Sequence, residues 1–303
     1  MNHADWRTTA DAGQFLAEAG PALRADPVEN TLLLTIAAAQ SAAAAAQSAP
    51  AHGAPAPSAA PGPTPARAPW FGWQPGGGTF VHSPGWPLVL GLMAEPAAAD
   101  LAVTLQHQGR SVAGVNGLPA TAHAFATQWQ RPQQTQRPAG TSRLFQRQRL
   151  FRLAGLTPPP PPPGQARMAT VDDRELLVEW TNAFHREANE SGRPDSGAAV
   201  DSRLAFGGQW LWENETGEPV ATAARTPVVG GMARVAPVYT PPERRGQGYG
   251  GAVTVAVSQA AQEAGAGEVV LFTDLANPTS NALYQRLGYR PVSDRHVLLF
   301  SAR

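Results

Sequence analysis

The stretch PPERRGQGYGGAV, Pro241–Val253, places Gly246, Gly248 and Gly250 at alternate positions, with Gly251 directly after them. Two arginines precede these glycines, and an alanine-rich segment of helical character follows. Glycine lets the main chain approach a ligand without a Cβ atom in the way. A helix N-terminus offers unpaired N–H groups and the positive end of the helix dipole. The pattern therefore predicts a turn that binds an anion at the start of a helix.

Two well-known phosphate-binding loops compete for this stretch. A Walker A loop requires a lysine, and the chain contains none. The dinucleotide fingerprint G-x-G-x-x-G is formally matched by Gly246, Gly248 and Gly251, with Asp274 at the end of the next predicted strand. A dinucleotide fold, however, places its fingerprint after the first strand and needs several βα units afterwards. Only one further strand, one helix and a closing hairpin are predicted here, so we reject it on architecture.

A third pattern, Arg-x-x-Gly-x-Gly between a strand and a helix, is matched from Arg245 to Gly250. A second motif follows in NPTSNALYQRLGYRPV, Asn277–Val292. These two motifs, at this spacing, and the element order from Ala166 to Arg303 resemble the GNAT family of acetyl-CoA-dependent N-acetyltransferases. The resemblance covers the second half of the chain.

The resemblance implies acetyl-CoA as co-substrate, with no metal. The pantetheine arm would bind to free main-chain groups where the strand before the turn separates from its neighbour, and the diphosphate would bind in the turn. The predicted coenzyme-binding residues are Val238, Tyr239, Thr240, Arg244, Arg245, Gly246, Gln247, Gly248, Tyr249, Gly250, Gly251, Asn277 and Tyr284.

The reaction implied is direct attack of an unprotonated primary amine on the thioester within a ternary complex. The N–H of Val238 corresponds to the group that stabilises the oxyanion, and Tyr284 corresponds to the general acid. Tyr284 also suits a packing role on an amphipathic helix. The strand Gly231–Thr240 contains no acidic residue, so the general base stays open between a water chain and three side chains, namely Glu213, Asp274 and His185.

The amino-acid composition limits the classes of partner and of chemistry that the chain can have. The 303 residues include 23 basic and 23 acidic side chains and no cysteine, which excludes disulfides and thiolate chemistry. Zero net charge favours neither nucleic acid nor a membrane surface. The N-terminus lacks a basic-then-apolar signal, and no run is apolar enough to span a bilayer. We expect a cytoplasmic protein that acts on a small-molecule or peptide amine; a homodimer is compatible with the sequence.

The predicted fold is α/β, an α+β arrangement with a mixed sheet, built as tandem GNAT-like domains. Residues 1–156 are predicted as a degenerate GNAT-like domain or another α/β accessory domain, with a disordered loop at 48–69. The six prolines Pro158–Pro163 predict a stiff linker over 157–165. Residues 166–303 are predicted as the catalytic GNAT domain, in the order βααβββαβαββ.

Two other functions fit parts of the pattern. A non-catalytic acetyl-CoA sensor or scaffold is compatible with the missing base. A nicotinamide-dependent oxidoreductase is the remoter alternative, because it depends on the dinucleotide fingerprint rejected above.

Overall fold

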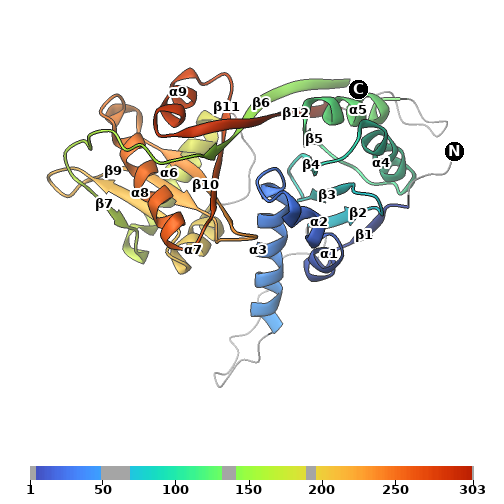
Figure 1. Cartoon of the computed structure of the whole chain (residues 1–303), viewed down its shortest axis with the longest axis horizontal. Helices are drawn as coiled ribbons and strands as arrows, with labels where there is room; N and C mark the ends of the chain where they lie inside the picture. The colour runs from blue at the N-terminus through green and yellow to red at the C-terminus, as the bar shows by residue number, and fades with distance from the viewer. Residues whose placement is uncertain (1–4, 49–68, 132–140, 189–195, 302–303) are drawn as a thin grey trace. The chain divides into compact units, whose positions relative to one another are not determined.

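A computed structural model describes residues 5–48, 69–131, 141–188 and 196–301; its helices and strands are labelled in Figure 1. The chain divides into two compact units. Unit 1 comprises Met1–Phe145 together with His296–Arg303, and unit 2 comprises Gln146–Arg295. Both contain helices and strands, in agreement with the predicted α/β class with a mixed sheet.

Unit 1 contains the strands β1 (Arg7–Thr9), β2 (Trp70–Trp73), β3 (Thr79–His82), β4 (Leu88–Leu90) and β5 (Gly114–Gly117), and the helices α1 (Ala12–Glu18), α2 (Gly20–Ala25), α3 (Thr31–Ser48), α4 (Glu95–His107) and α5 (Pro119–Trp129). The strands lie in the order β1-β2-β3-β4-β5. Strands β4 and β5 are parallel, with α4 as their crossover. Aromatic side chains fill both faces of the sheet: Phe80 packs in the core with α4 and α5, and Phe15 of α1 stacks on Phe71.

Unit 2 contains most of β6 (Thr141–Leu153), the strands β7 (Gln165–Met168), β8 (Gln209–Glu213), β9 (Pro219–Arg225), β10 (Met232–Tyr239) and β11 (Glu268–Asp274), and the first half of β12 (Tyr289–Ser301). Its helices are α6 (Arg174–Glu187), α7 (Gly197–Ala205), α8 (Tyr249–Glu263) and α9 (Pro278–Arg286), with short 3-10 turns η2 (Val171–Asp173) and η3 (Pro242–Arg244). The strands lie in the order β12-β6-β11-β10-β9-β8-β7.

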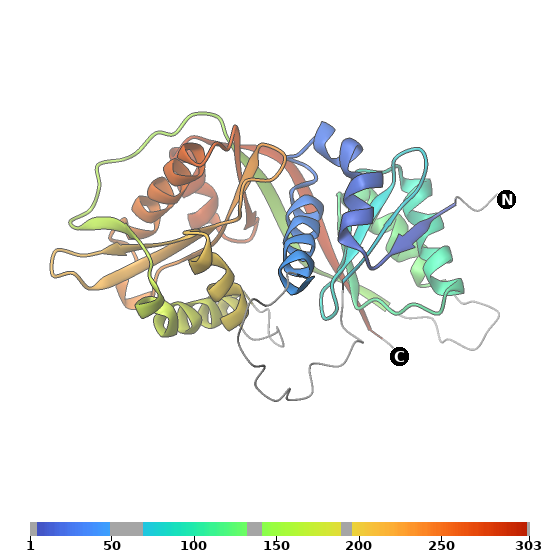
Figure 2. The ribbon, with the colours of Figure 1, turned by 90° about the horizontal axis from the view of Figure 1, so that it is seen from below.

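Helices cover both faces of the unit 2 sheet. Helices α6 and α8 lie on opposite sides of it (Figure 2). Alternate residues of β10 explain this arrangement: Ala233 and Val235 pack in one core with α8, whereas Tyr239, beyond a bulge, packs in a second core with Leu177 of α6 and Val200 of α7. The turn that opens α8 and the end of β10 are therefore held by two separate cores.

The division into units differs from the predicted domain boundaries. Residues Gln148–Arg152 of β6 pair with Asp274–Val270 of β11, so unit 2 begins before the prolines. Pro158–Pro163 lies within unit 2, where the indole N–H of Trp212 donates to the Pro163 carbonyl. The pairings between β6 and β11 join residues more than 100 positions apart, which local patterns do not indicate. Residues 49–68 of the predicted 48–69 loop lie outside the described residues.

The predicted closing hairpin is a single strand, β12, of 13 residues. Its second half leaves unit 2: His296–Leu299 pairs with Gly117–Gly114 of β5 in unit 1. Within unit 2, Arg149 of β6 forms a bidentate ion pair with Asp294, at 2.7 and 3.0 Å. The predicted hairpin would have paired the first half of β12 with its second half. In the structure the first half lies beside β6, which comes earlier in the chain.

Candidate coenzyme-binding site

The glycine turn has the backbone that the sequence predicts. Gly246 has φ +76° and Gly248 has φ +87°, in the left-handed region where a side chain is strained. Gly248 is the N-cap of α8 and forms no side-chain cap, so the first-turn N–H groups have no acceptor from that position. Gly246, Gln247 and Gly248 are exposed. The turn thus presents main-chain N–H groups and the positive end of α8 to an anion.

Gly250 and Gly251 lie where neighbouring side chains leave little room for a Cβ atom. A Cβ at Gly250 would lie 3.1 Å from the Thr240 hydroxyl, and a Cβ at Gly251 would lie 3.2 Å from a methyl of Leu283 in α9. Tyr249, between the turn and these contacts, is buried in the core with α8. Gly250 and Gly251 therefore let α8 begin close to β10 and α9.

Both predicted arginines lie beside the turn and are ion-paired. Arg245 donates from Nε to the Thr240 carbonyl at 2.9 Å and from Nη2 to Glu187 at 2.6 Å. Arg244 donates to both carboxylate oxygens of Glu218, at 2.5 and 2.7 Å. Glu187, the last residue of α6, also accepts a hydrogen bond from the Tyr239 hydroxyl.

Glu187 was not predicted. It is one acidic residue among many on an amphipathic helix, and no local signal distinguishes it. Burial, and then the bond to Glu187, raise the pKa of Tyr239. This carboxylate therefore anchors both Tyr239 and Arg245 at the edge of the site.

Strand β10 separates from β11 where the coenzyme arm was predicted. The two strands pair in parallel from Met232–Glu268 to Val235–Leu271. A cis peptide joins Ala236 to Pro237, and beyond it Val238 and Tyr239 pair with β9 on the other side. Pro237 has no N–H to donate, so Val238 carries the first main-chain N–H after the bulge. The end of β10 therefore keeps an edge that is not paired with β11.

Helix α9 supplies the other two predicted residues. The Asn277 side chain caps it by accepting from the Ser280 N–H at 3.0 Å. Tyr284 is buried in the core with α8, and its ring meets that of Tyr289 edge-on, with centroids 6.0 Å apart. Burial raises the pKa of Tyr284 to about 12, so its hydroxyl stays protonated at neutral pH.

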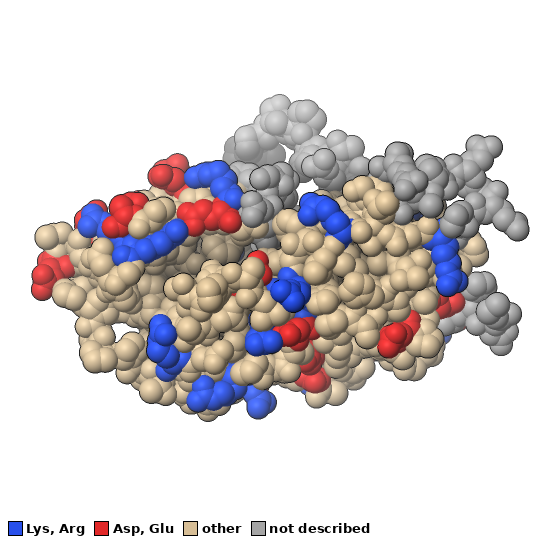
Figure 3. Space-filling view, turned by 90° about the horizontal axis from the view of Figure 1, so that it is seen from above, with Lys and Arg blue, Asp and Glu red and all other residues tan. Residues whose placement is uncertain are grey.

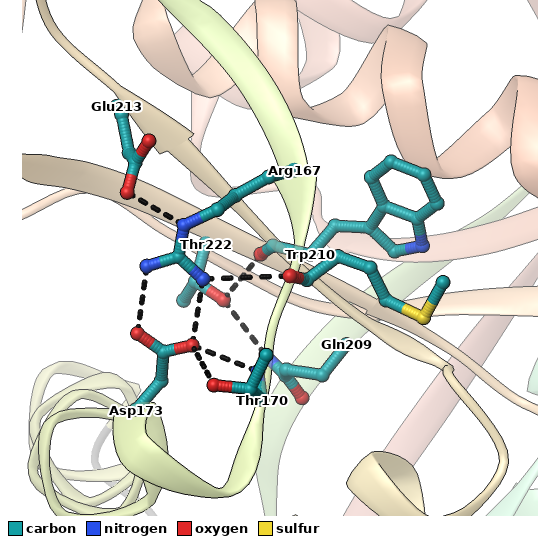
Figure 4. A network of polar contacts seen from close by, with 8 residues as sticks. Arg167, Thr170, Asp173, Gln209, Trp210, Glu213 and Thr222 are labelled. Carbon is teal, nitrogen blue, oxygen red and sulfur yellow. Dashed lines mark hydrogen bonds and ion pairs between the residues drawn. The ribbon is translucent and has the colours of Figure 1, made fainter. Parts of the chain in front are cut away.

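The candidate bases are engaged elsewhere. The Glu213 carboxylate is ion-paired with Arg167 at 2.5 Å, and Figure 4 shows the arginine between Glu213 and Asp173. Asp274 accepts from the Ala276 N–H at 2.9 Å and from Gln146. His185 lies edge-on to Phe184 on α6. No contact in the described part of the chain singles out one of them as a base.

The Arg167 network has a testable effect on stability. Arg167 bridges two carboxylates that are largely buried, so Arg167→Met is expected to lower the free energy of unfolding at pH 7 by about 2 kcal/mol. Arg167 is the main cause that holds the pKa of Asp173 below its ordinary value. This contribution is present above the ordinary pKa, about 3.9, and is lost as the pH falls through the folded-state pKa. Urea unfolding at pH 7 and pH 3 measures it, and the difference should shrink at pH 3.

A matched control is Arg174→Met, because the Arg174–Asp201 pair is exposed and its loss should be undetectable in the same assay. Arg167→Met should also cost less in an Asp173→Asn background. Equal losses for both arginines would contradict the assigned role of the network.

Clusters of charge and of metal-ligating side chains among the described residues would mark a further site. Arginine and acidic side chains are interspersed on the face seen in Figure 3. Within the described ranges, no cluster of three or more His, Asp or Glu side chains could hold a metal ion. None of the helices in those ranges is long and apolar enough to cross a bilayer.

Comparison with known proteins tests the family. The model of the acetyltransferase (GNAT) family matches residues 174–289, which span α6 to the start of β12. Residues 174–289 are therefore similar to a GNAT acetyltransferase domain, and this segment is called the GNAT domain below. This domain contains β10, the glycine turn, α8 and α9. A search of curated proteins finds no match to the chain.

Solved structures share the fold over more than the GNAT domain. A GCN5-related N-acetyltransferase from Sphaerobacter thermophilus is 16% identical, with 100% of this chain and 96% of that chain covered and a TM-score of 0.59. One from Kribbella flavida is 21% identical over 75% and 87%, with a TM-score of 0.53. A GNAT acetyltransferase from Colwellia psychrerythraea is 12% identical over 78% and 86%, with a TM-score of 0.51. At these identities the likeness concerns the fold, which unit 1 shares together with the GNAT domain.

Proposed function

We propose that this chain transfers an acetyl group from acetyl-CoA to a primary amine, without a covalent enzyme intermediate. The observation that carries the proposal is the left-handed turn at Gly246 and Gly248, which opens α8 beside the end of β10 that is unpaired with β11. The turn suits the diphosphate, and the unpaired strand suits the amide groups of pantetheine, which add to a strand edge as a peptide does.

The proposed reaction consists of addition to the thioester and collapse of the resulting intermediate. The amine nitrogen attacks the thioester carbonyl carbon, and a C–N bond forms while the carbonyl oxygen becomes an oxyanion near the Val238 N–H. The intermediate collapses with cleavage of the C–S bond. The proton lost by the attacking nitrogen passes through water or a base, and the leaving thiolate takes one proton in return.

Tyr284 is assigned to the leaving sulfur. Its pKa of about 12 exceeds that of a thiol, about 8.5, so it releases its proton reluctantly. We therefore assign it chiefly as a hydrogen-bond donor that stabilises the developing thiolate. Burial disfavours the charged phenolate, so the buried hydroxyl is better suited to donate a hydrogen bond than to give up its proton.

Two measurements test the proposal together. Calorimetry is expected to detect acetyl-CoA binding and no comparable binding of NAD. Release of free coenzyme A is expected when a panel of primary amines is added with acetyl-CoA. Acetyl-CoA binding with no amine turned over would favour a sensor, and NAD binding without acetyl-CoA binding would favour the oxidoreductase.

A further inference from the structure

Three arginines of unit 2, namely Arg203, Arg225 and Arg234, each have one buried side-chain nitrogen that lacks a hydrogen-bond partner among the described residues. In Arg203 of α7 and Arg234 of β10 this atom is Nη1, and the rest of each side chain is partly exposed. Neither side chain forms an ion pair with a described residue. Buried guanidinium groups are ordinarily paired, because desolvation of an unpaired charge is costly. Two neighbouring arginines without a counter-ion therefore require an explanation.

The two side chains extend from different elements toward the same face of the unit 2 sheet. Ala233 and Val235 face α8, so strand alternation directs Arg234 to the other face of the sheet, which α6 and α7 cover (Figure 2). On α7, Arg203 follows Val200 by three residues and therefore shares the side that packs toward that face. Helix α7 and strand β10 thus direct one arginine each into the layer between them.

The two guanidinium groups repel each other electrostatically. Burial, and then the positive charge of Arg203, lower the pKa of Arg234 to about 10. Burial lowers the pKa of Arg203 to about 10 as well. Both groups are still positively charged at pH 7, so the layer holds two like charges with no acid among the described residues to neutralise them. A ligand anion would neutralise them.

This layer shares strand β10 with the proposed reaction site. Arg234 precedes Val238 by four residues on that strand. We propose that Arg203 and Arg234 bind an oxyanion group of the acceptor, so that the acceptor is a primary amine that also bears a carboxylate or a phosphate. Guanidinium forks bind both groups in a planar, bidentate manner. The inference rests on the proposed function, and it specifies the class of substrate.

A binding experiment tests the site without any turnover. Thermal unfolding of the wild type is measured in chloride-free buffer with acetate, with inorganic phosphate and with neither. We expect one of the two anions to raise the melting temperature. In Arg203→Met and Arg234→Met, we expect a higher melting temperature than wild type without anion, because an uncompensated charge is gone. We also expect a smaller anion-dependent rise than in the wild type, since the glycine turn can still bind an anion.

Arg225→Met is the matched control. Arg225 is half-buried on the neighbouring strand β9, and its Nε is also buried without a partner. It pairs in register with Val235 and so faces the α8 side, and its Nη1 donates to the Thr226 carbonyl. This variant should keep the anion-dependent rise. The same rise in all three variants, or no rise in the wild type with either anion, would overturn the site.

A turnover experiment identifies the source of the anion. Dipeptides with a free C-terminus are compared with their C-terminal amides, and phosphoethanolamine with ethanolamine. One anionic series is expected to exceed its neutral counterpart at least tenfold in kcat/KM. Arg234→Met and Arg203→Met should bring that ratio close to one while the KM for acetyl-CoA is unchanged. Equal use of charged and neutral amines by the wild type would overturn the inference and leave the proposed function standing.

The experiments distinguish failure of the proposed function from failure of the proposed anion site. If acetyl-CoA does not bind and no amine is acetylated, the proposed function fails, and with it the acceptor role of the pair. The thermal experiment still decides whether Arg203 and Arg234 bind an oxyanion.

Discussion

Replacing Gly248 by alanine is expected to raise the Kd and the KM for acetyl-CoA about tenfold, and replacing it by valine more. Gly248 adopts φ +87° at the N-cap of α8, where an L side chain costs about 1–2 kcal/mol. A Cβ there meets no atom closer than Pro162 at 3.8 Å, so steric overlap within the protein is absent. The chain relieves the strain by moving the N–H groups out of register with the diphosphate, and each 1.4 kcal/mol lost is a factor of ten.

The control is Gly265→Ala, at the opposite end of α8. Gly265 has φ +90° and open space around its Cβ position, so the backbone strain is matched. Both alanine variants should lose similar unfolding free energy in urea, and only Gly248→Ala should lose affinity for acetyl-CoA in calorimetry. Unchanged affinity in Gly248→Ala would mean that the turn does not bind the coenzyme.

Replacing Tyr284 by phenylalanine is expected to lower kcat about 10- to 100-fold with little change in the KM for acetyl-CoA. The hydroxyl is proposed to act on the leaving sulfur in the transition state, so its loss removes an interaction absent from the ground state. The phenylalanine ring retains the edge-on contact with Tyr289. With a pKa of about 12, Tyr284 keeps its proton from pH 7 to pH 10, so its ionisation should produce no fall in the wild-type rate over that range.

Tyr289→Phe separates catalysis from packing. Tyr289 is fully buried beside Tyr284, and its hydroxyl is 2.7 Å from the Ser258 hydroxyl. Its loss should lower stability by about 1 kcal/mol and leave kcat near the wild-type value. Full activity in Tyr284→Phe, or equal losses of kcat in the two variants, would return Tyr284 to a packing role.

Much of the candidate site could be predicted because its signals are local. A glycine at positive φ, a helix start and an asparagine cap each depend on a few neighbouring residues, and the structure contains all three at Gly248, the start of α8 and Asn277. The strand β10 and the helix α9 were likewise predicted close to their observed bounds. The coenzyme side of the proposal therefore follows from patterns within single segments.

The acceptor side could not be predicted in this way. Arg234 is one arginine in a strand, and Arg203 is one in a short helix; only the folded structure leaves the Nη1 atom of each buried without a partner. Glu187 likewise lies far in sequence from Tyr239 and Arg245, which it contacts. Charge pairing depends on distance in space, and single-segment patterns carry no information about it.

By itself, the sequence determined the GNAT-like motifs, the glycine turn at the start of α8 and the order of elements from the strand before α6 to α9, since backbone conformation and hydrophobic periodicity are local properties. Only the tertiary structure decided that β6 joins unit 2 beside β11 and that the end of β12 joins unit 1 beside β5. Only the tertiary structure likewise decided which carboxylates have an arginine partner and which arginines lack a carboxylate partner. Strand partners and counter-ions are chosen among residues far apart in the chain, and the choice is made by packing and desolvation when the chain folds.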